Sequence, residues 1–113
     1  MHPIIHSKSS QKHFGGCWED YIPIHNFMDS SKVHAADCRH RHTHHTDVGI
    51  EQVVLKFGET VTLSDGGSVP TRAVATQHIK EDCGGYIPTK EDWFKELRKQ
   101  PWMFSKWLSP KLQ

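Results

Sequence analysis

The stretch that decides the fold runs over residues 31–57, SKVHAADCRHRHTHHTDVGIEQVVLKF. It contains no proline, its only internal glycine is Gly49, and it ends at Phe57-Gly58, where a glycine is expected just beyond a helix. Its later half is apolar on more than one side, which is typical of a heavily buried helix. We therefore predict a long central helix over about residues 31–57.

On the N-terminal side of this stretch, residues 18–29 predict a short helix. Proline is tolerated only in the first turn of a helix, so Pro23 indicates a start near Tyr21 or Ile22. Residues 1–16 carry Pro3, a Ser/Lys/Gln-rich stretch and a glycine pair, and we expect them to form an irregular N-terminal segment.

On the C-terminal side, residues 60–71 alternate around a Ser-Asp-Gly-Gly turn, which is the pattern of a β-hairpin. Residues 72–83 predict a helix that ends before a glycine pair. Lys90–Lys99 predict the last helix, with Thr89 as its N-cap and acidic residues in its first turn. Residues 100–113 form an aromatic C-terminal tail that we expect to pack over the core.

These elements predict a mainly α fold: a small helical domain with one short β-hairpin. A length of 113 residues indicates a single domain over residues 1–113. Lys plus Arg is 14 and Asp plus Glu is 13, which argues against a general nucleic-acid coat protein. Nucleic acid stays possible as a partner, but the sequence does not support it. No apolar run approaches the roughly 20 residues of a membrane helix, so no membrane partner is expected.

The compartment is predicted from the N-terminus and the cysteines. Met1–Lys8 shows no positive stretch followed by an apolar core, so we expect no signal peptide. The three cysteines are an odd number without a Cys-x-x-Cys pair, which argues against a disulfide framework and a zinc ribbon. We therefore expect a cytoplasmic protein.

Histidine is the outlier of the composition, with ten residues, of which five lie between His34 and His45. On a helix, residues four apart share a face, so His40 and His44 would lie side by side. Neutral imidazole is a common ligand for zinc and other transition metals, and two imidazoles on one helix face can chelate an ion. The continuous run could equally be a solvated face, and we expect His42 to be exposed.

A second pair completes the predicted site. His78 and Asp82 are again four apart, on the inward side of the 72–83 helix. With His40 and His44 they would form a four-ligand site for a divalent metal ion, zinc first, with manganese, iron or nickel as alternatives. His6 and His25 would be further ligands or outer partners, and His25 could instead be a core histidine bonded to a backbone carbonyl.

The motifs as a set resemble an uncharacterised family of small His-rich bacterial and phage-encoded proteins. The resemblance covers residues 4–103 and implies no activity. It implies that eight residues belong to the family pattern, namely His6, His25, His34, His40, His44, His45, His78 and Asp82, whereas His42 departs from it. The resemblance is carried by His6-x-x-Ser9 through Gly15-Gly16, Glu19–His25, Arg39-His40-Arg41 with His44-His45, Phe57-Gly58, Val69-Pro70-x-Arg72, Gln77–Asp82, Ile87-Pro88 and Gln100–Met103.

The function predicted first is a metal-dependent hydrolase acting on a phosphoester or nucleotide-type substrate. His45 or His34 would be the general acid or base, and Arg41 or Arg39 would bind a small anionic substrate. A looser analogy to HD-domain phosphohydrolases rests on the fold class alone, because the chain lacks an adjacent His-Asp pair. The alternatives are a structural metal site or a metal-free histidine core. In both cases the protein would act through binding or a homo-oligomeric interface, and a homodimer contact could begin at Ser105.

Overall fold

The computed structural model describes residues 1–104 and confirms a mainly α fold with one two-stranded hairpin. Four short 3-10 helices connect or follow the longer elements: η1 Trp18–Asp20, η2 Ser30–Val33, η3 Cys38–His42 and η4 Pro101–Phe104. The α-helices are α1 Pro3–Phe14, α2 Ile22–Met28, α3 Asp47–Phe57, α4 Thr71–Asp82 and α5 Lys90–Phe94, and the strands are β1 Thr60–Thr62 and β2 Ser68–Pro70.

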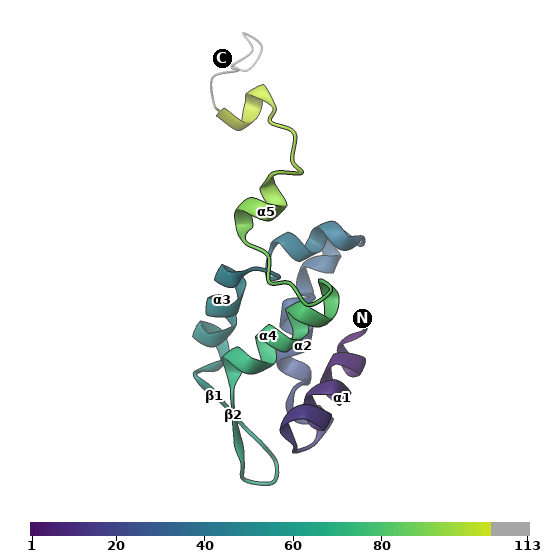
Figure 1. Cartoon of the computed structure of the whole chain (residues 1–113), viewed down its shortest axis with the longest axis vertical. Coiled ribbons are helices and arrows are strands. Elements are labelled where there is room, and N and C mark those ends of the chain that lie inside the picture. The colour runs from purple at the N-terminus through teal and green to yellow at the C-terminus, as the bar shows by residue number, and fades with distance from the viewer. Residues whose placement is uncertain (105–113) are drawn as a thin grey trace.

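Helix α4 is the centre of the fold, with α3 on one side and α1 and α2 on the other (Figure 1). The apolar core between them is made by fully buried side chains such as Tyr21 and Met28 from the α2 side, Val53 from α3, and Val74 and Ile79 from α4. The predicted 72–83 helix is thus confirmed as α4, and α2 begins at Ile22 as predicted. No helix among residues 1–104 is long and apolar enough to cross a membrane.

The hairpin is confirmed at the predicted place. β1 pairs antiparallel with β2, with Val61 opposite Val69. The strands are short. Val69 of β2 and Leu63, which follows β1, bury their side chains in the apolar core, and a two-stranded sheet needs such packing for stability. The hairpin leads directly into α4 and so sets where that helix begins.

The N-terminal segment was predicted as irregular, and this is wrong: Pro3–Phe14 forms helix α1. Pro3 lies in the first turn, where its missing N–H costs nothing, and the His2 side chain accepts a hydrogen bond from the Ile4 amide. The buried residues of α1 are His6, Ser7 and Ser10, so its inner face is polar. The spacing of apolar residues does not predict α1, because the buried face of this helix consists of polar side chains.

The long central helix is also wrong, because residues 31–57 break twice. Asp37 is extended and its carboxylate accepts the Arg39 amide at the start of η3. Thr46 is extended and its hydroxyl accepts the Gly49 amide at 2.8 Å, so α3 begins only at Asp47. Asp and Thr are strong N-cap residues, and here each starts a new helix inside the stretch that is predicted as a single helix.

The first turn of α3 leaves no room for a side chain at position 49, which explains the glycine there. A Cβ at this position would lie 1.9 Å from the His44 carbonyl oxygen. The loop that carries His44 and His45 therefore passes directly over the first turn of α3. A glycine inside the predicted helix is in fact the residue that lets the preceding loop fold back against it.

The C-terminal part differs from expectation in two ways. Helix α5 has the predicted N-cap, because Thr89 and Asp92 form a reciprocal capping box, but it ends at Phe94 rather than Lys99. The start of the aromatic tail does not pack over the core, since Trp102 and Met103 are 62% and 43% exposed. The homodimer contact expected from Ser105 onward falls on residues 105–113, outside the described part of the chain.

Candidate metal centre

Four histidines and two aspartates meet in the interior, where α1, the end of α2, η3, the loop before α3, and α4 come together. Their side chains are 5% exposed or less. Burying charged carboxylates beside imidazoles is costly unless the groups are paired or hold an ion. The six residues, which we call the His/Asp centre, are His6, Asp29, His40, His45, His78 and Asp82.

Asp82, at the end of α4, faces three of the imidazoles. Its Oδ1 lies 3.2 Å from His6 Nε2, and its Oδ2 lies 2.8 Å from His45 Nε2. The same Oδ2 lies 3.3 Å from His78 Nε2, one turn earlier on the helix. The structure thus places His78 and Asp82, which were predicted as ligands, side by side with both side chains buried.

Asp29 closes the other side of the His/Asp centre. Its Oδ1 lies 3.2 Å from His78 Nε2, 3.6 Å from His40 Nε2 and 3.8 Å from His45 Nε2. All four imidazoles thus direct Nε2 toward carboxylate oxygens. His6, Asp29, His78 and Asp82 offer donor atoms that all lie within 4.8 Å of one another.

These spacings suit an ion. Donor atoms that are neighbours around a tetrahedral or octahedral ion, with bonds of about 2.1 Å, lie about 3.0–3.4 Å apart. Three of the His–Asp contacts fall at 3.2 or 3.3 Å. His6 Nε2, His40 Nε2 and Asp29 Oδ2 are buried without a hydrogen-bond partner. Buried polar atoms are normally satisfied, so these three leave donors available for a ligand.

Outer contacts orient two of the imidazoles. His40 Nδ1 lies 2.7 Å from the Asp37 carbonyl, which can only accept, so Nδ1–H donates and the neutral ring keeps a lone pair on Nε2. His6 Nδ1 lies 2.8 Å from Glu81 Oε1 and donates to this carboxylate in the same way. Outer carboxylate or carbonyl partners of this kind are typical of metal-ligating histidines.

His78 is oriented by a histidine rather than by a carboxylate. Its Nδ1 lies 2.8 Å from His25 Nδ1, and His25 Nε2 lies 2.8 Å from the Ser10 hydroxyl. If His78 Nδ1–H donates to His25, then His25 Nε2–H donates to Ser10, and His78 Nε2 carries the lone pair. His25 contacts His78 and Ser10, and His6, His25 and His78 also offer donor atoms within 4.8 Å of one another, so its two predicted roles, further ligand and outer partner, both stay predictions.

Burial and the neighbouring carboxylates shift the pKa values of these groups in different directions. Burial is the largest effect on His25 and His45, and it lowers their pKa values to about 2 and about 4, so both rings are neutral at pH 7. Burial lowers the pKa of His78, but hydrogen bonds to Asp29 and Asp82 outweigh it and raise the value. Burial also raises the pKa of Asp82, yet the imidazoles of His45, His6 and His78 beside its carboxylate hold it well below its usual range.

The predicted ligands divide into two groups. His6, His40, His78 and Asp82 belong to the His/Asp centre. His44 does not: the segment is not an α-helix, and the His44 ring packs against Phe27 with centroids 4.4 Å apart. His44 was predicted as a metal ligand because residues four apart share a face of an α-helix. That condition is not met here.

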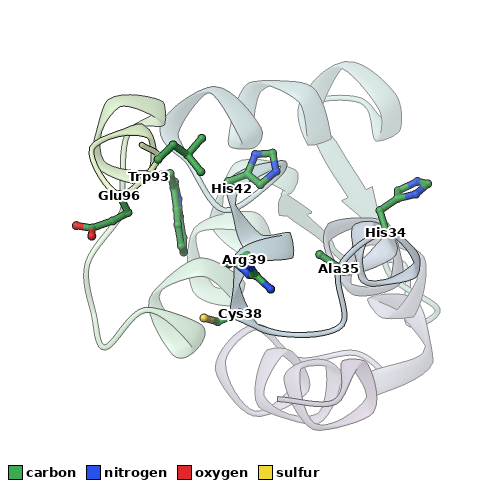
Figure 2. A pocket seen from close by; sticks show the side chains of 8 residues that line it. His34, Ala35, Cys38, Arg39, His42, Trp93 and Glu96 are labelled. Atoms are coloured by element: carbon green, nitrogen blue, oxygen red, sulfur yellow. The ribbon is translucent and has the colours of Figure 1, made fainter. Parts of the chain in front are cut away.

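The predicted catalytic residues also lie in places that differ from the expectation. His45, expected as a general acid or base, lies inside the His/Asp centre, with its Nε2 2.8 Å from Asp82 Oδ2. His34 is exposed and lines a separate cavity, together with Arg39 and the exposed His42 (Figure 2). Arg39 pairs with Asp37, which was one of the open alternatives for the two arginines.

Arg41 keeps a place beside the His/Asp centre. Its Nη1 donates to the Asp82 carbonyl at 3.2 Å, and its Nη2 lies 3.9 Å from Asp82 Oδ1. The amino group of Met1 lies 3.1 Å from the same Oδ1. The Arg41 and Met1 side chains are 26% and 35% exposed, so the surface nearest to Asp82 carries two positive groups.

Asp29 is the member of the His/Asp centre that the sequence does not predict. In the sequence it stands only as an acidic residue four positions after His25 and at the end of the 18–29 helix. It follows the last residue of α2, and its backbone begins η2, so its local role is that of a helix terminus. Only the packing of α2 against α4 brings its carboxylate onto His78.

Comparison with known proteins identifies the family. The chain belongs to the family of the domain of unknown function DUF6915, whose family model matches residues 1–103 and so contains the whole His/Asp centre. No curated protein and no solved structure matches the chain. Membership of an uncharacterised family is thereby confirmed, and the bacterial and phage origin stays a prediction.

Proposed function

We propose that this protein is a metal-dependent hydrolase that acts on a phosphoester or nucleotide-type substrate at the His/Asp centre. The observation that carries the proposal is the convergence of four imidazole Nε2 atoms on two buried carboxylates. The donors are nitrogen and oxygen without a thiolate, a set suited to zinc, manganese, iron or nickel. A bound divalent ion would activate water and polarise the phosphorus centre.

Arg41 supports an anionic substrate rather than a purely structural ion. A guanidinium 3.9 Å from a ligand carboxylate opposes cation binding by Coulomb repulsion. The same group favours a phosphate beside the ion, because arginine binds phosphate oxygens with two parallel hydrogen bonds. The chain's own contribution would be to hold the ion through the His/Asp centre and to orient the anionic group through Arg41.

The alternative, a structural metal site without turnover, is favoured by one observation. The four histidine side chains are 2% exposed or less, and structural sites are closed by protein ligands. A metal-free histidine core is less well supported, since it would leave His6 Nε2 and His40 Nε2 buried without hydrogen bonds.

The first experiment is elemental analysis of the untagged chain, purified without a nickel column. We expect stoichiometric transition metal, and we expect its loss in Asp82→Asn, because this change removes the charge that faces three imidazoles. The matched control is Asp47→Asn, an exposed carboxylate, which should retain the metal. Absence of metal, together with no thermal shift on adding zinc, manganese, iron or nickel, would overturn the proposal.

The second experiment separates hydrolase from structural site. Arg41→Gln removes the cation next to Asp82 and leaves every ligand in place. With bis(p-nitrophenyl) phosphate and a panel of nucleotides as substrates, a hydrolase should show lower turnover in this variant with unchanged metal content. If the metal-loaded wild-type chain hydrolyses none of these esters, the structural alternative stands instead.

A further inference from the structure

A cavity of about 590 Å³ lies outside the His/Asp centre, between η3 and α5 (Figure 2). Cys38, Arg39 and His42 of η3 line it, together with Trp93 of α5 and Glu96 just after α5. This volume falls in the range of small-molecule sites, which combine apolar walls with a few polar groups. Neither the proposed metal chemistry nor the core uses these side chains.

The η3 helix connects this cavity to the His/Asp centre. In a 3-10 helix, residues three apart lie on the same face, so Arg39 and His42 share one face while His40 lies on another. His40 is buried and faces Asp29, whereas Arg39 and His42 line the cavity. A ligand in the cavity would therefore rest on the same short element that holds a predicted metal ligand.

Trp93 supplies an aromatic wall. Its indole Nε1–H donates to the His45 carbonyl at 3.0 Å, so its polar atom is already satisfied within the protein. The rest of the ring is available to the cavity, which it lines from the α5 side. Aromatic side chains placed in this way stack with planar rings.

The cavity lining carries one positive and one negative side chain, Arg39 and Glu96. Asp37 holds the Arg39 guanidinium through Nε and Nη2, at 3.0 and 2.7 Å. Glu96 offers acceptor oxygens, and the imidazoles of His34 and His42 can both donate and accept. A cavity of this kind suits a neutral planar ring with hydrogen-bonding edges better than it suits a free anion.

We propose that this cavity binds the heteroaromatic base of a nucleoside or nucleotide, stacked on Trp93 with its polar edge toward Glu96 and His42. The inference deepens the proposed function, on which it rests for the role of the phosphate. Arg39 and Arg41 are two residues apart, so their Cα atoms are at most about 7.6 Å apart. Arg41 is not among the residues that line the cavity, so this bound gives only the distance that a phosphate attached to the base would have to span to reach it.

The test measures binding by calorimetry on the full chain, with adenosine, guanosine, cytidine, uridine and their 5′-monophosphates. Each is measured with EDTA present and again with metal added. We expect saturable binding of at least one nucleoside under both conditions. Trp93→Leu should lower the association constant at least about fivefold, because base–aromatic stacking contributes on this scale. The matched control Trp102→Leu, at a tryptophan that is 62% exposed, should leave binding unchanged.

A second variant guards against misfolding, since Trp93→Leu also removes the bond to the His45 carbonyl. His42→Ala changes an exposed side chain that lines the cavity, and it should weaken nucleoside binding at least about twofold. Binding of all nucleosides too weak to saturate at millimolar concentration would overturn the inference. So would equal weakening by Trp102→Leu, or binding of single-stranded oligonucleotides alone.

The two proposals fail separately. Nucleoside binding by a chain that takes up no metal keeps the base site and overturns the hydrolase proposal. Stoichiometric metal without nucleoside binding overturns the base site and leaves the metal centre standing.

Discussion

Helix α4 and the segment before α3 both contribute side chains to the His/Asp centre, yet the spacings of these residues along the chain differ. On α4, His78 and Asp82 are four apart, and both face the centre. Before α3, His40 and His44 are also four apart, but His40 faces Asp29 while His44 packs on Phe27. The second residue that this segment contributes to the His/Asp centre is His45, five residues after His40. A sequence spacing therefore carries geometric meaning only within the type of helix that the chain forms.

The largest effect is expected at the point where the segment turns into α3. Gly49→Ala would place a Cβ 1.9 Å from the His44 carbonyl oxygen, and backbone on both sides of this contact would have to move. We expect a loss of at least about 3 kcal/mol in the free energy of unfolding, measured by urea denaturation.

The matched control is Val48→Ala, at the neighbouring and exposed position of the same helix turn. It should change the free energy of unfolding by less than about 0.5 kcal/mol. A Gly49→Ala protein as stable as this control would show that the loop does not pass over α3 as described.

The difference between His40 and His44 can be tested directly. His40→Ala removes a donor that faces Asp29, and the affinity for zinc should fall more than about 100-fold, beyond the 10- to 100-fold typical of an outer partner. His44→Ala removes only packing on Phe27, and it should leave the zinc affinity within about threefold of wild type. Competition with a chromophoric chelator measures both. Equal losses in the two variants would restore the helical spacing as the correct description.

A smaller effect is expected from the outer partners. Glu81→Gln keeps the size of the side chain but removes the carboxylate that receives His6 Nδ1–H. The zinc affinity should fall about 10- to 100-fold, with the fold intact by circular dichroism. Glu59→Gln, an exposed carboxylate at the hairpin, serves as the control and should show no change. A wild-type affinity in Glu81→Gln would mean that His6 is not a ligand.

The smallest effect concerns a carboxylate far from the His/Asp centre. Asp20 accepts the Cys17 and Ser64 amides, and these hydrogen bonds lower its pKa in the folded state. A depressed folded pKa contributes stability above the unfolded pKa of about 3.9, and this contribution is lost as the pH falls through the folded pKa. Asp20→Asn should therefore flatten the decline of the melting temperature below about pH 4. A decline as steep as in wild type would contradict this account, and Glu19→Gln is the neighbouring control.

Much of the fold could be predicted because its signals are local. The Ser-Asp-Gly-Gly turn places the hairpin, the glycine pair after Cys83 ends α4, and Thr89 with Asp92 starts α5. Each of these depends on residues within one turn of one another, so sequence alone carries enough information. The wrong predictions, α1 and the central helix, occur where buried faces are polar or where caps lie inside a run that is otherwise suited to a helix.

The His/Asp centre was only partly predictable for the same reason. The sequence by itself determined that His78 and Asp82 share a face of one helix, and that the histidine-rich segment is the place to look for their partners. The tertiary structure alone decided that His45 rather than His44 faces Asp82, and that Asp29 joins them from the end of α2. Those contacts form across the core between residues up to 49 positions apart, and no local pattern encodes how helices pack at that distance.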